Sequence, residues 1–78
     1  MKSNNERSDP VKLPIIITPG ENGWIVAECP AIPGCISQGK TKEEAMENIK
    51  EAIEGCILVR KEMGLPPVEE IRELEVVL

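Results

Sequence analysis

The residues best suited to chemistry in this 78-residue chain are three cysteines, three serines and many carboxylates, with no histidine to act as a base. The three cysteines are Cys29, Cys35 and Cys56. No two of them have the Cys-x-x-Cys spacing, and without a histidine they do not complete a zinc site. We interpret them as small buried apolar residues in a reducing compartment, although a bridge from Cys29 to Cys35 across the intervening turn is geometrically conceivable. No metal and no cofactor are therefore expected.

The serines and acids also lack the arrangement of an active site. No recognisable base lies near the serines in the sequence, and no glycine-rich phosphate loop precedes a helix. Glu28 is the one acid expected in mid-strand beside apolar neighbours, and one carboxylate cannot hold two metal ions. The sequence therefore predicts a protein that is not an enzyme, with metal-dependent cleavage of nucleic acid through Glu28 kept as an alternative.

Charge and composition indicate the kind of partner. The 14 acidic residues outnumber the 9 basic ones, and the resulting net charge of -5 repels phosphate backbones. Trp24 is the only aromatic residue, so one copy of the chain cannot build the stacking surfaces that hold single-stranded nucleic acid. The sequence has neither a membrane span nor a signal peptide, so we expect a cytoplasmic location and a basic protein partner.

Turn signals divide the chain into short elements. Residues 1–10 carry a single apolar side chain and are expected to form a disordered N-terminal tail, followed by a single domain over residues 11–78. A hairpin signal at Asn22-Gly23 separates the first two apolar runs, and Pro33-Gly34 predicts a type II turn before the third. Strands are expected over residues 12–18, 24–29 and 35–38.

Several small or polar residues are assigned to turns and caps rather than to a direct function. Thr41 and Glu44 match a capping box that starts a helix, and Gly64 supplies the left-handed residue that ends it. Asn48 lies beside the apolar stripe of this helix and is expected to bond to loop backbone at the edge of the sheet. The glycines and proline assigned to turns are Gly23, Pro33, Gly34 and Gly39.

The last eight residues, IRELEVVL (71–78), alternate in polarity and predict a fourth strand. A right-handed crossover from the helix would place this strand parallel to the first strand and beside it. The expected fold is therefore α+β, a two-layer β-β-β-α-β arrangement with one helix on a four-stranded mixed sheet of order 3-2-1-4. One helix covers only one face, so the other face is expected either to close on a second copy or to receive a different protein. The candidate partner-binding residues on that face are Trp24, Val26 and Glu28.

Three motifs occur in order along the chain: NGWIVAECPAIPGC (22–35), SQGKTKEEA (37–45) and NIKEAI (48–53). In these motifs the sequence resembles the HicB-like antitoxin family in its short form. The resemblance implies a degenerate ribonuclease-H-like fold that has lost its nuclease residues. It also implies the antitoxin of a type II toxin–antitoxin pair, which binds and neutralises a small basic HicA-type mRNA-cleaving toxin by blocking its active site.

The resemblance also bears on DNA binding and assembly. Many members of the family carry a C-terminal helix-turn-helix or ribbon-helix-helix segment, and no such segment follows Leu78 here, so direct DNA binding is not expected. A homodimer or higher homo-oligomer is expected, and a dimer core would explain Trp24 as well as a toxin contact does. The alternative function is a stand-alone oligomeric HicB-like regulatory or scaffold module without a cognate toxin.

Overall fold

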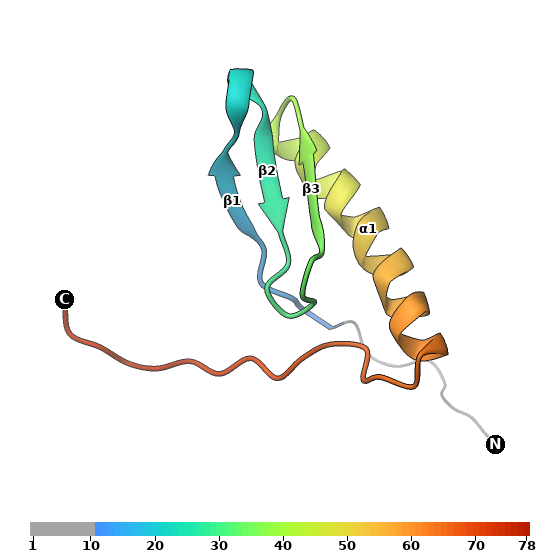
Figure 1. Ribbon diagram of the computed structural model, residues 1–78. Coiled ribbons are helices and arrows are strands. Elements are labelled where there is room, and N and C mark those ends of the chain that lie inside the picture. Colours follow the sequence, from blue (N-terminus) through green and yellow to red (C-terminus); the bar gives the residue numbers. More distant parts are fainter. Residues whose placement is uncertain (1–10) are drawn as a thin grey trace.

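The computed structural model describes residues 11–78 and consists of a three-stranded antiparallel sheet followed by one long helix (Figure 1). The sheet has the order β1-β2-β3, with each strand antiparallel to its neighbour. The tail expected over residues 1–10 lies outside the described residues. The elements are β1 (Ile16–Pro19), β2 (Ile25–Glu28), β3 (Ile36–Gly39) and α1 (Lys42–Glu62).

Two tight turns fold the strands back on one another. In the first turn, which includes the 3-10 segment η1 (Glu21–Gly23), Asn22 and Gly23 both have positive φ, at 57° and 81°. This is the type I′ geometry that matches the twist of a hairpin. In the second turn the N–H of Cys35 donates to the carbonyl of Ile32 at 3.0 Å, and Gly34 takes a φ of 80°. A left-handed residue at that position is what a type II turn needs.

Side chains and glycine geometry define both ends of α1. The Thr41 hydroxyl accepts a 3.0 Å hydrogen bond from the N–H of Glu44. The Glu44 carboxylate accepts from the N–H of Lys40, one residue before the cap, rather than from the cap residue itself. At the other end the N–H of Leu65 donates to the carbonyl of Arg60 at 2.8 Å, and Gly64 has a φ of 76°. These features form a Schellman motif, which stops the helix.

The core is aliphatic and lies between α1 and one face of the sheet. The helix packs mainly on β3 and next on β2, so it covers the sheet unevenly (Figure 1). Gly39 allows a close approach of the helix to β3, because a β-carbon there would lie only 2.5 Å from the backbone nitrogen of Ala45. The fully buried residues are Ala27, Cys29, Ala31, Ile32, Cys35, Ala45 and Ile49.

The prediction of a fourth strand, and with it the four-stranded sheet of order 3-2-1-4, was wrong. After α1 the chain runs as an extended segment away from the sheet and pairs with none of the strands within residues 11–78 (Figure 1). Its start is held at the β2–β3 loop, where the N–H of Glu69 donates to the carbonyl of Ala31 at 2.7 Å. The alternating pattern of residues 71–78 predicts an extended backbone, but it does not specify which strand that backbone pairs with.

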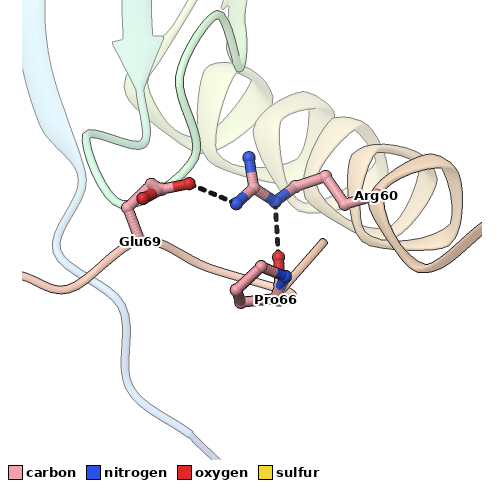
Figure 2. Close-up of polar contacts among 3 residues, drawn as sticks. All are labelled: Arg60, Pro66 and Glu69. Carbon is pink, nitrogen blue, oxygen red and sulfur yellow. Dashed lines mark hydrogen bonds and ion pairs between the residues drawn. The ribbon is translucent and has the colours of Figure 1, made fainter. Parts of the chain in front are cut away.

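The anchor of this segment also involves the end of the helix. Arg60 donates through Nε to the carbonyl oxygen of Pro66 at 2.7 Å and pairs through Nη2 with the Glu69 carboxylate (Figure 2). The Arg60 side chain is only 12% exposed. A planar guanidinium that bonds to two groups at once fixes the direction in which the chain leaves the helix.

Candidate partner-binding face

The face of the sheet that points away from α1 is covered by no other described element. Residues alternate across a strand, so the core residues Ile17 and Ala27 place their strand neighbours on the opposite side. We call this side the open sheet face. The strand residues on it are Ile16, Thr18, Val26, Glu28, Ile36 and Gln38.

Glu28 lies in the middle of a row that crosses all three strands. The register pairs it with Ile16 on one side and with Ile36 on the other. These isoleucines are 46% and 55% exposed. Among residues 11–78, Glu28 has no ion-pair partner. A carboxylate between two exposed isoleucines is suited to pairing with a cation on a partner that covers the row.

Val26 and Trp24 continue the same face toward the hairpin. Val26 lies in the next row, and Trp24 precedes β2 in extended conformation. A β-carbon at Gly20 would lie 3.0 Å from Cγ2 of Val26 and 3.6 Å from Cβ of Trp24, so the chain entering the hairpin passes close beside both. The three predicted contact residues therefore lie in a line along β2, with Glu28 at the far end.

A positive charge accompanies the tryptophan. The Nζ atom of Lys40 lies 5.8 Å from the centroid of the Trp24 ring, within the range of a cation–π interaction. Asn22, Gly23, Trp24 and Lys40 line a shallow hollow of about 260 Å³ at this corner. The open sheet face thus has a lysine at the Trp24 end and an acid at the other, which gives a partner an orientation as well as an apolar surface.

The cysteines lie in the core and are not arranged for nucleophilic chemistry. All three are free thiols, with Cys29 and Cys35 buried and Cys56 half-buried. Burial, helped by the neighbouring Cys56 and Cys29, raises the pKa of the Cys35 thiol to about 11. The thiol is therefore protonated at neutral pH and is a poor nucleophile. Among residues 11–78 no three potential metal ligands cluster.

The residues assigned to turns and caps lie away from the open sheet face or at its corners. Asn48 donates from Nδ2 to the carbonyl oxygen of Gln38 in β3 at 2.7 Å. Sequence reasoning did not name Ile16, Ile36 or Lys40 as part of the face. The continuous apolar run through Ile16 indicated that this strand has apolar side chains on both faces of the sheet. The positions of Ile36 and Lys40 beside β2 follow instead from the strand register.

The fold places the chain among small α+β proteins with one covered and one open sheet face. The family described as HicB-like antitoxins of bacterial toxin–antitoxin systems matches residues 13–77, and the chain belongs to this family. The description of this family is that of an antitoxin, which is a regulatory role. Across residues 11–78, no helix combines the length and the apolar character needed to cross a membrane.

Similar proteins occur in archaea and bacteria. The chain is 55% identical to the UPF0150 protein Ta0767 of Thermoplasma acidophilum over 47 residues, which cover 60% of this chain and 68% of that protein. It is 43% identical to a UPF0150 protein of Archaeoglobus fulgidus over 51 residues, covering 65% and 74% of the two chains. A UPF0150 protein of Helicobacter pylori is 56% identical over 39 residues, or 50% and 53% of the chains. No solved structure matches.

Proposed function

We propose that this protein is an antitoxin that neutralises a small basic HicA-type mRNA-cleaving toxin by binding it on the open sheet face. The family supports the antitoxin role, and the observation that carries the location of the site is the row Ile16–Glu28–Ile36. The chain acts by binding rather than by catalysis. Its site of action is the cytoplasm, where the toxin's mRNA substrate is found.

Charge supports a basic partner. The net charge of -5 attracts a basic protein over a distance and accelerates its association, and it disfavours direct contact with DNA phosphates. At contact, the two isoleucines exclude water around Glu28, so a lysine or arginine of the toxin would form a charge-assisted hydrogen bond in a drier environment. Loss of one member of such a pair leaves the other buried and unpaired, which weakens binding strongly.

The test begins with the tagged chain purified from its native host together with the proteins bound to it. A small basic protein recovered in fixed ratio would then be assayed for RNA cleavage while the chain is added back. We expect cleavage to stop at an equimolar ratio. A recovered ribonuclease that stays active at that ratio would contradict the antitoxin role, and recovery of the chain alone would favour a stand-alone oligomeric module.

A charge-neutralising pair of variants locates the site. Glu28→Gln keeps the shape of the side chain and removes its charge, whereas Glu43→Gln makes the same change in the exposed first turn of α1. We expect Glu28→Gln to weaken toxin binding by about tenfold or more and Glu43→Gln to leave it nearly unchanged. Equal effects of the two variants would mean that only net charge matters and that the open sheet face is not the site.

A further inference from the structure

The C-terminal segment is apolar on one side but touches little in its own chain. We call residues 71–78 the C-terminal arm. Leu74 is 86% exposed, Val76 63%, and Leu78 fully exposed. Among residues 11–78, no backbone hydrogen bond holds the arm beyond Glu69. Exposed leucine and valine side chains in a row on an extended backbone are typical of a segment that binds a partner.

The anchor at the base of the arm directs it outward. The bonds from Arg60 to Pro66 and Glu69 hold the chain just after the helix (Figure 2). From there the arm runs away from both the sheet and the helix (Figure 1). The structure therefore presents the arm to another molecule instead of folding it onto its own core.

An apolar groove of about 510 Å³ lies between the chain that leads into β1 and the first half of α1. It forms there because α1 lies over β3 and β2 and leaves the β1 side less covered, and because β1 pairs with β2 alone among the described strands. Met46, one of its wall residues, is 44% exposed. The apolar lining is Val11, Leu13, Ile15, Met46, Ile49 and Ile53.

The apolar residues that line the groove and those of the arm have the same spacing along the chain. Val11, Leu13 and Ile15 line the groove at every second residue of the leading chain. In the arm Leu74, Val76 and Leu78 also recur at every second residue, which in extended chain is a repeat of about 6.7 Å. Two extended segments with the same repeat can lie side by side with their apolar side chains in register under the helix.

We propose that the groove binds the C-terminal arm of a second copy of this chain, and that the second copy's groove receives the first arm in return. One chain supplies both complementary surfaces, so a two-fold symmetric pair satisfies both at once. Within each chain the sheet keeps its three strands. The groove lies on the helix side of the sheet, so the dimer leaves the open sheet face free for a different partner.

The first test is the mass of the full-length protein in solution, measured by light scattering after gel filtration. We expect twice the chain mass of 8.6 kDa at micromolar concentration. Val76→Glu places a charge on the apolar side of the arm, and Val77→Glu places the same charge on the other side. Val76→Glu should raise the dimer dissociation constant by about tenfold or more, and Val77→Glu should change it little.

The groove is tested in the same way. Met46→Glu changes an exposed residue in the groove wall, and Leu58→Glu changes a residue of α1 that is 62% exposed and lies outside the groove. We expect Met46→Glu to produce monomers and Leu58→Glu to leave the dimer intact. Circular dichroism spectra that match the unaltered protein would show that the variants are folded, and Val76 lies outside the core in any case.

Mixing the two defective variants distinguishes arm exchange from any other dimer. The Met46→Glu variant has an unaltered arm, and the Val76→Glu variant has an unaltered groove. In a mixed pair the unaltered arm can bind the unaltered groove, so one of the two contacts stays intact. At a protein concentration at which neither variant alone is dimeric, the mixture should therefore form dimers. A monomeric unaltered protein, a dimer that Ile36→Glu on the open sheet face disrupts while Val76→Glu does not, or a mixture that stays monomeric would each overturn the proposal. None of these outcomes depends on toxin binding.

Discussion

The side-chain amide of Asn48 donates a 2.7 Å hydrogen bond to the main-chain carbonyl of Gln38, which ties the second turn of α1 to β3. This contact joins the two elements that have the most extensive contact with each other among residues 11–78. It also satisfies a strand carbonyl with a helix side chain, so the register between helix and sheet is set by a directional bond as well as by apolar packing.

Replacing Asn48 removes that bond. We expect Asn48→Ala to lower the free energy of unfolding by about 1 kcal/mol, and by more if the Gln38 carbonyl finds no water. Asn48→Asp should cost at least as much, because a carboxylate cannot donate to a carbonyl. Urea denaturation would measure both. An Asn48→Asp variant as stable as the original protein would show that the bond contributes nothing.

Two glycines offer a matched pair of substitutions. A β-carbon at Gly39 would lie 2.5 Å from the backbone nitrogen of Ala45, whereas one at Gly55 in α1 would meet nothing within 4 Å. Gly39→Ala should therefore destabilise the protein by about 2 kcal/mol or more, since backbone must move. Gly55→Ala should stabilise it by about 0.5–1 kcal/mol through helix propensity. Thermal denaturation of both variants checks the opposite signs.

Because the Cys35 thiol is buried, we expect the folded protein to lose stability at high pH. Burial and the neighbouring cysteines raise its pKa from the ordinary 9.0 to about 11. The folded state therefore holds the proton more tightly than the unfolded state, and stability falls as pH rises from about 9 to about 11. Urea midpoints across this range should fall less steeply in Cys35→Ala than in the original protein. Identical slopes would remove Cys35 as the cause.

Trp24 is expected to be an anchor for the toxin. It is a large amphipathic side chain at the end of the open sheet face, next to Lys40, and such residues contribute strongly at interfaces. Trp24→Ala should weaken toxin binding by about 2 kcal/mol, or roughly thirtyfold. Leu58→Ala, at an exposed position on the other side of the molecule, is the control. Inhibition curves with the recovered toxin would compare them, and equal curves would exclude Trp24 from the site.

Local signals in the sequence identify most of the elements. Asn22-Gly23 takes the two positive φ values of a hairpin turn, and Thr41 caps the helix. The first strand is shorter than the pattern predicted and begins at Ile16 instead of Lys12. Ile16 pairs with Glu28, the last residue of β2, so residues 12–15 have no β2 residue opposite them. Strand length here depends on the partner strand, which periodicity does not describe.

The candidate site, too, could be predicted from the sequence only where the relation between residues is local. Alternation along one strand predicts that Trp24, Val26 and Glu28 share a side, because that relation is local. The isoleucines on either side of Glu28 come from strands 12 and 8 residues away in the sequence, and their positions depend on the register. The wrong fourth strand has a related cause, since pairing of a C-terminal segment is a long-range choice that its own sequence does not specify.

The order in which elements pack has a consequence for how fast the chain folds. β1 packs on β2, β2 on β3, and β3 on α1, so each of the main interfaces joins neighbours in the sequence. Loops that close between such neighbours are short, so little loop-closure entropy is lost before each contact forms, which favours fast folding. A newly made copy is therefore expected to become able to bind soon after synthesis, so the supply of binding-competent protein would follow its rate of synthesis closely.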